Sequence, residues 1–133
     1  MITLAEAKRI IAAAETKATE IKQPQNIAVV DEGGNLVAHV RMDGAWIGSV
    51  DIAIKKAWTA RAFDIATEDL TKLAQPGKPF YGIQQSNDGR VIILAGGVPL
   101  KRGEKVVGAI GVSGGTGEQD QEVAEAGLEA FGS

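Results

Sequence analysis

Two cationic side chains, Arg41 and Lys56, could together hold a carboxylate or another small anion. An arginine can grip a carboxylate through two parallel hydrogen bonds, and a lysine adds a compact positive charge. Glycine-rich turns let a ligand reach backbone amides, because no Cβ stands in the way. The predicted ligand site therefore combines the two cations with the backbone of Gly97, Ser113 and Gly114.

Both parts of this predicted site also have a purely structural interpretation. Arg41 could pair with its neighbour Asp43 and leave Lys56 in solvent. The segment 113–117 could be a tight turn between a strand and a helix. Acidic residues follow it in the first helical turn and would compete with a ligand for the helix dipole; they are Glu118, Asp120 and Glu122. The residues alone leave both interpretations open.

The single histidine, His39, is a candidate general base or axial haem ligand. The alternative is a half-exposed histidine on the polar face of a strand, with no role in chemistry. A hydrolytic triad would have to join Ser113 to His39, and no partner acid is evident.

The absence of cysteine excludes thiolate metal sites and cysteine nucleophiles. One histidine excludes a multi-histidine metal site, so no metal site is predicted. Phe80 and Tyr81 could close over a ligand or simply anchor a loop.

The composition argues against nucleic acid and membrane as partners. The 133 residues fit one domain, and 14 Lys and Arg against 17 Asp and Glu give a net charge of −3. Binding to phosphate backbones needs a basic excess, which is missing. No apolar run approaches the roughly 20 residues that cross a bilayer. The first residues lack the basic-then-apolar order of a signal peptide, so we expect a cytoplasmic protein.

The first half of the chain predicts a helix followed by a hairpin. A capping box at Thr3 and Glu6 starts an amphipathic helix that Pro24 ends. Residues 27–31 and 36–42 are rich in strand-forming side chains, and the Gly-rich segment 32–35 joins them as a hairpin. Alternation along the second strand places His39 and Arg41 together, opposite the face that carries Leu36, Ala38, Val40 and Met42.

The second half predicts helices separated by three strands. Ser49 is the expected N-cap of a helix to about residue 63, whose apolar stripe is Val50, Ile54, Ala57 and Trp58. A short helix follows Thr67, and residues 75–89 form a loop. The expected strands are 91–94, 98–100 and 105–112, and the expected last helix is 118–131. Short connections favour a mainly antiparallel sheet covered by helices, an α/β chain of the α+β type in one domain, 1–133.

Five segments in this order resemble the GlcG/HbpS-like family, which includes the C-terminal domain of PduO-type cobalamin adenosyltransferases. They are residues 28–37, 41–45, 56–60, 96–100 and 107–115, followed by Gln119 and Asp120. The resemblance spans the chain essentially from end to end. It implies a profilin-like fold of α/β/α layers with a five-stranded antiparallel sheet. It also implies haem binding in some members and homo-oligomers, commonly dimers that build larger assemblies.

Three functions are compatible with these residues. The first is a small-ligand-binding protein for haem or another tetrapyrrole, with His39, Tyr81 and Met42 as possible ligands. Haem-binding members that use histidine place it near the first helix, where this chain has none. The second is an enzyme or accessory protein for a small organic acid in a catabolic pathway, which would use Arg41 and Lys56. The third is a structural subunit of an oligomer. Whether the chain catalyses a reaction stays open at this point.

The resemblance predicts that the protein forms a homo-oligomer in solution. Light scattering or sedimentation at micromolar concentration should give a mass of at least two chains. A single-chain mass over the whole accessible concentration range would contradict this prediction.

Overall fold

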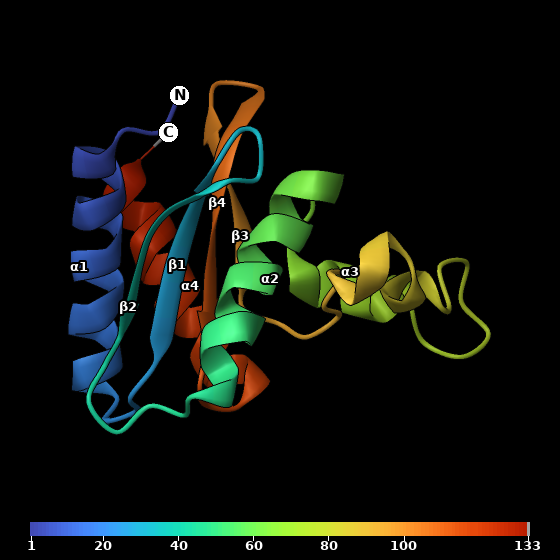
Figure 1. The fold of residues 1–133 in the computed structure, drawn as a ribbon, viewed down its shortest axis with the longest axis horizontal. Coiled ribbons are helices and arrows are strands. Elements are labelled where there is room, and N and C mark those ends of the chain that lie inside the picture. Colours follow the sequence, from blue (N-terminus) through green and yellow to red (C-terminus); the bar gives the residue numbers. More distant parts are fainter. Residues whose placement is uncertain (133) are drawn as a thin grey trace.

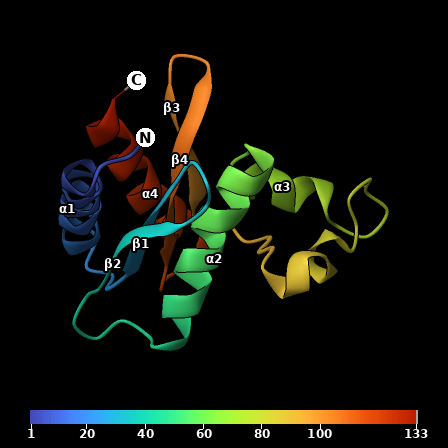
Figure 2. The same ribbon diagram turned by 45° about the horizontal axis from the view of Figure 1, so that its top comes forward.

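The computed structural model describes residues 1–132 and shows an antiparallel sheet with helices on both faces (Figure 1). The strands are hydrogen-bonded in the order β2-β1-β4-β3, and each neighbouring pair is antiparallel. Helices α1 and α4 cover one face and α2 covers the other (Figure 2). The predicted α+β class is confirmed. The elements are α1 (Leu4–Glu20), β1 (Asn26–Asp31), β2 (Leu36–Arg41), α2 (Gly48–Phe63), α3 (Thr67–Leu73), β3 (Gly97–Arg102), β4 (Lys105–Ser113) and α4 (Gly117–Phe131).

The predicted fifth strand is wrong: the sheet has four strands within the described residues. The segment 91–94 runs as irregular backbone instead of pairing with a strand. Its backbone polar groups find side-chain partners, since the Ile92 amide donates to Thr59 Oγ1 (3.0 Å) and Thr71 Oγ1 donates to the Ile93 carbonyl. Threonines of α2 and α3 thus replace the partners that a neighbouring strand would supply.

Helix α1 forms as its sequence pattern predicts. The Glu6 amide donates to Thr3 Oγ1 (3.1 Å) and the Thr3 amide donates to Glu6 Oε1 (3.0 Å), which is the expected capping box. One face of the helix is buried against the sheet and α4, and it consists of Ala7, Ile10, Ile11, Ala14 and Ala18. Within residues 1–132, neither α1 nor another helix is long and apolar enough to span a membrane.

Strands β1 and β4 form the centre of the molecule. Ile27 and Val29 contribute to the core beneath α1 and α4, whereas Val30 joins a smaller cluster under α2. In β2 the register with β1 shifts between Val29 and Val30, so Leu36 pairs with Val30. This bulge removes Leu36 from the face on which the simple alternation placed it, and the side chain is half exposed.

Helix α2 differs from its predicted start and its predicted buried face. It begins at Gly48 with Ile47 as an uncapped N-cap, and Ser49 is buried inside the first turn. The buried stripe is built from small side chains, among them Ala53, Ala57 and Ala60, together with Lys56. Val50, Ile54 and Trp58 are only partly buried. Small side chains let α2 approach the sheet closely, which the larger apolar residues would prevent.

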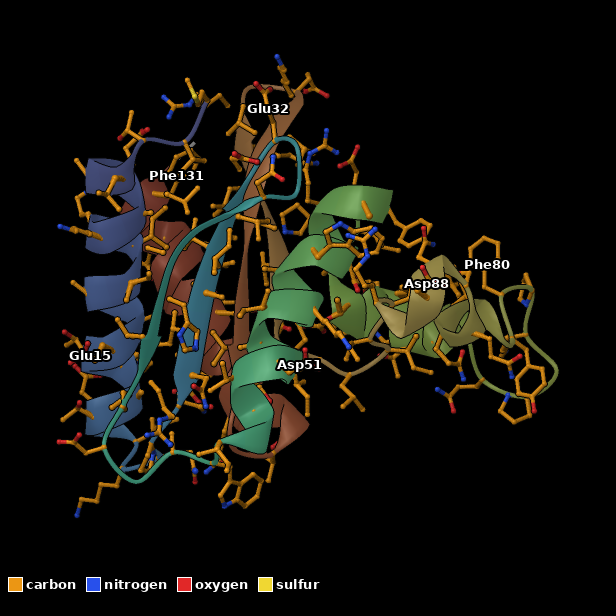
Figure 3. All side chains as sticks on the ribbon, viewed as in Figure 1. Glu15, Glu32, Asp51, Phe80, Asp88 and Phe131 are labelled. Carbon is orange, nitrogen blue, oxygen red and sulfur yellow. The ribbon has the colours of Figure 1, made fainter. Side chains whose placement is uncertain are left out.

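Helix α3 and the residues that follow it project away from the sheet as an arm (Figure 3). The helix begins at Thr67 as predicted, with Ala66 as its N-cap. The predicted loop 75–89 contains two short 3₁₀ turns, Ile83–Gln85 and Asn87–Gly89. Phe80 and Asp88 both lie on this arm in Figure 3, and Phe80 and Tyr81 are exposed.

The contact between α2 and β4 predicts a strong effect of one added methyl group. A Cβ on Gly111 would lie 2.0 Å from the Ala53 carbonyl oxygen and 2.5 Å from the Ala57 amide nitrogen. We expect Gly111→Ala to lower the free energy of unfolding by about 1–3 kcal/mol, as overpacking of an interior does. Gly48→Ala is the matched control, since no atom lies within 4 Å of its Cβ position. Urea denaturation measures both, and equal midpoints for the two variants would contradict the close approach.

Candidate functional site

A buried ion pair between α2 and α4 is the main polar feature of the interior. Lys56 Nζ lies 2.9 Å from Asp120 Oδ2, and the two side chains are 2% and 5% exposed. The same ammonium donates to the Val112 carbonyl of β4 at 2.8 Å. A charge taken out of water needs partners of this kind, because an unpaired buried charge costs several kcal/mol. Lys56 therefore ties α2, β4 and α4 together.

Asp120 also satisfies the turn that leads into α4. The Gly115 amide donates to Asp120 Oδ1 at 2.9 Å. Thr116 and Gln119 form a capping box, so their amides are satisfied within the helix end. Asp120 thus accepts from both Lys56 and the turn, and it occupies the place that a bound anion would take at this helix N-terminus.

Burial controls the protonation of Lys56. Loss of water around the ammonium lowers its pKa below the ordinary value, and the charge and hydrogen bond of Asp120 oppose this effect only in part. A lysine whose pKa is lowered by burial holds a larger fraction of neutral amine than a surface lysine at the same pH. Such lysines can act as nucleophiles or bases.

A pocket of about 280 Å³ opens above this ion pair, and we call it the Lys56 pocket. Two hydroxyl side chains, Ser49 and Ser113, line it while being nine-tenths buried or more. Within residues 1–132 neither hydroxyl makes a hydrogen bond, so both are available to a ligand. The full lining consists of Trp46, Ser49, Ile52, Lys56, Leu94, Ala95, Ser113, Gly114, Gly115, Gly117 and Asp120.

The mouth of the Lys56 pocket is apolar. Trp46 is 67% exposed and Leu94 is 54% exposed, although both have large hydrophobic side chains. Ile47, next to Trp46 in the chain, is also exposed. Large apolar side chains that gather at a pocket mouth are typical of a ligand-binding surface. An apolar mouth over a polar floor suits a ligand with a hydrophobic body and one polar group.

The structure brings together three of the five residues predicted to bind a ligand. Lys56, Ser113 and Gly114 line one pocket. Gly97 packs against the Lys56 backbone from the next strand, but its amide already donates to Thr67 Oγ1 at 2.8 Å. The Lys56 ammonium already donates to Asp120 and Val112, so these two contacts take the place of a bound anion.

Arg41 lies outside the Lys56 pocket. It lines a separate hollow of about 340 Å³ in which two carboxylate side chains, Glu15 and Asp43, also take part. The alternative Arg41–Asp43 ion pair is not formed either, among the residues that the structure describes. Arg41 and Lys56 thus do not share one site in this fold, and anion binding at Arg41 stays a prediction.

His39 is half buried on β2 and already has a partner. Its Nε2 lies 3.1 Å from Asn26 Oδ1, while Asn26 Nδ2 donates to the Trp46 carbonyl at 2.9 Å. Because the Asn26 oxygen accepts, Nε2 carries the hydrogen and its lone pair is not free. Burial, and then the charge of Arg41, lower the pKa of His39, which favours the neutral ring. Only Nδ1 remains for a metal.

The other predicted haem ligands are not at the Lys56 pocket. Tyr81 lies on the projecting arm, and Met42 packs against the hydrophobic core. No group of three or more carboxylate or histidine side chains that could hold a metal ion occurs in residues 1–132.

A larger hollow of about 690 Å³ lies beside the edge strand β3 and the end of α4. Its lining includes Lys101, Asp64, Asp69 and Glu129, and it contains none of the predicted ligand residues. None of these side chains is buried. We regard the smaller Lys56 pocket as the candidate site because the buried polar side chains Ser49, Lys56, Ser113 and Asp120 converge there.

The parts of the site that depend on tertiary structure leave little signal in the sequence. Asp120 was considered only as a competitor for the helix dipole, and its partnership with Lys56 joins residues 64 positions apart. Trp46 and Leu94 received no role. An exposed Trp-Ile pair just before a helix was the available signal for an apolar mouth.

Comparison with known proteins identifies the family. A family model described as haem degrading protein HbpS-like matches residues 2–129. The chain belongs to the HbpS-like family. The resemblance based on the five sequence segments is confirmed. Three of these segments supply residues that line the Lys56 pocket or pack against Lys56, namely 56–60, 96–100 and 107–115.

Three relatives extend this result. The crystal structure of Klebsiella pneumoniae protein ORFY is 48% identical, covers 98% of this chain and 90% of that chain, and has a TM-score of 0.95. The crystal structure of a PduOC:heme complex is 35% identical, covers 92% and 89%, and has a TM-score of 0.90. The corrinoid adenosyltransferase PduO of Citrobacter freundii is 37% identical over 98% of this chain but only 39% of its own length. The family description names haem degradation, and the PduOC structure is a complex with haem.

The buried ion pair predicts a large difference between two adjacent lysines. Lys56→Met leaves the Asp120 carboxylate buried without its cation, so we expect a loss of about 3–5 kcal/mol in the free energy of unfolding. Lys55→Met is the control, because Lys55 pairs with Asp51 near the surface and should change stability by about 1 kcal/mol or less.

Adding Asp120→Asn to Lys56→Met removes the stranded charge and should restore part of the lost stability. Urea denaturation of the wild type and these variants measures all three effects. If Lys56→Met were no more harmful than Lys55→Met, the ion pair would not hold the interior together.

Proposed function

We propose that this protein binds haem or another tetrapyrrole across the mouth of the Lys56 pocket. The observation that carries the proposal is the exposed apolar surface of Trp46 and Leu94 at that mouth, with Ile47 also exposed next to Trp46 in the chain. A porphyrin face is flat and hydrophobic, and burial of apolar surface drives such binding. The family description and the PduOC:heme complex support haem as the ligand.

The size of the pocket decides how a tetrapyrrole could fit. Pockets that enclose drug-sized ligands measure about 300–1,000 Å³. At about 280 Å³ the Lys56 pocket is too small to enclose a macrocycle of four pyrrole rings. The residues fit a macrocycle that lies on the apolar mouth, and they do not fit one sunk into the interior. A bound haem would keep one face or edge in solvent or against another subunit.

The available ligand atoms predict weak haem binding. The His39 Nε2 is engaged by Asn26, and no other histidine is present. Tyr81 lies on the projecting arm and Met42 is packed against the core. Affinity would then come from apolar contact rather than from a strong bond between this chain and the iron.

The two alternative functions draw less support. An enzyme for a small organic acid would need both predicted cations, but Asp120 neutralises Lys56, and Glu15 and Asp43 surround Arg41. A purely structural subunit would not explain two available hydroxyls beside a buried lysine. Ligand binding accounts for more of the observations.

Haem titration followed at the Soret band tests the proposal. Trp46→Ala removes the largest apolar contact at the mouth and should weaken binding about tenfold or more, since burying such a side chain contributes about 1.5–3 kcal/mol. Phe63→Ala is the control: Phe63 is also exposed but lies at the far end of α2. Equal affinities for the two variants would contradict binding at the Lys56 pocket.

His39→Ala should leave the Soret maximum of the haem complex unchanged, because the free lone pair of Nε2 is missing in the folded protein. A shifted maximum, with folding intact by circular dichroism, would show that His39 ligates the iron and that the ring turns away from Asn26 to do so.

A further inference from the structure

We propose that the Lys56 amine forms a reversible Schiff base with a small uncharged aldehyde or ketone that enters the Lys56 pocket. This inference is independent of haem binding, which uses the apolar mouth of the pocket and not the amine. It rests on the position of Nζ, on the available hydroxyls beside it and on the apolar walls above it.

The position of Nζ leaves one direction of approach. An ammonium has three hydrogens, and two of them point to the Val112 carbonyl and Asp120 Oδ2. On another side lies Gly96, where a Cβ would stand only 3.0 Å from Nζ. Glycine is needed here, because a Cβ would also stand 2.5 Å from the Val112 carbonyl oxygen and press against the ion pair. Lys56 itself contributes to the pocket lining, so we place the remaining direction of approach on the pocket side.

Two hydroxyl groups could receive the oxygen of a carbonyl compound. Ser49 and Ser113 are 4% and 5% exposed, line the same pocket and make no hydrogen bond within residues 1–132. A carbonyl oxygen would accept a hydrogen bond from either hydroxyl and place its carbon next to Nζ.

The surroundings favour an uncharged ligand. Lys56 and Asp120 together carry no net charge, and Trp46, Ile52 and Leu94 supply hydrophobic walls. A carboxylate entering this pocket would lose its hydration and would meet Asp120 beside Lys56. A short aliphatic aldehyde loses little hydration and fits a volume of about 280 Å³.

The reaction needs no further reagent. Asp120 accepts a proton from the Lys56 ammonium, and the freed lone pair of Nζ attacks the carbonyl carbon. The C–N bond forms as the carbonyl π bond breaks, and a proton moves from the attacking nitrogen to the oxygen to give a carbinolamine. Loss of this hydroxyl as water, with the proton returned by Asp120, forms the C=N bond. Burial lowers the pKa of Lys56 and so assists the first step.

Reductive trapping with butanal tests the proposal on the intact protein. Butanal, limited to about the protein concentration, is added with cyanoborohydride, which reduces an imine to a stable secondary amine. Peptide mapping by mass spectrometry should find one adduct per chain, at Lys56. Unfolding the protein in urea before labelling should abolish this preference. Labelling that spreads over exposed lysines such as Lys55 and spares Lys56 would overturn the proposal.

Two variants distinguish the role of the Lys56 amine from the role of its proton acceptor, Asp120. Lys56→Arg keeps the positive charge but cannot form the imine, so the selective adduct should disappear, whereas Lys55→Arg should retain it. Asp120→Asn removes the proton acceptor and should slow labelling at Lys56. Should Lys56→Arg fail to fold, the labelling pattern of the wild type still decides the question. An adduct that persists in folded Lys56→Arg would contradict the proposal.

Discussion

The contact between Lys56 and Asp120 determines how the helices sit on the sheet. It places a positive charge from α2 and a negative charge from α4 within 2.9 Å of each other at the end of β4. Burying two charges is tolerable only with such close pairing, because each ion loses several kcal/mol of hydration. The Val112 carbonyl completes the arrangement from the sheet itself. Two helices from opposite faces of the sheet are thereby fixed to one strand end.

This contact also shapes the candidate site. Close approach of α2 requires Gly111 of β4, Gly97 of β3 and the preceding Gly96, which leave room for backbone and for the lysine amine. The result is a small pocket with a neutral ionic floor, available hydroxyls and apolar walls. Such a pocket disfavours anions and favours uncharged groups. The exposed tryptophan and leucine at its mouth extend the apolar surface beyond the pocket.

Local patterns predicted the elements well and the site only in part. A capping box and apolar spacing gave α1 close to its observed bounds, because both signals lie within a few residues of each other. The apolar residues after a glycine-rich turn gave α4 to within one residue, whereas its capping box was not predicted. The segment 91–94 looked like a strand by composition, but threonines from two helices satisfy its backbone. For Lys56 the sequence left open an anion ligand or a solvated side chain, and neither included Asp120, which lies far along the chain. Register also escaped prediction, as the bulge opposite Leu36 shows.

The most direct test of this account is the titration of the Lys56 side chain by heteronuclear NMR. The account predicts an ammonium signal that is protected from solvent exchange, that loses its proton at lower pH than the exposed lysines, and that moves when Asp120 is changed to Asn. Burial lowers the pKa of Lys56, so its ammonium signal should disappear at a lower pH than the signals of the exposed lysines. A Lys56 signal that exchanges freely and titrates together with Lys55 would contradict the buried ion pair.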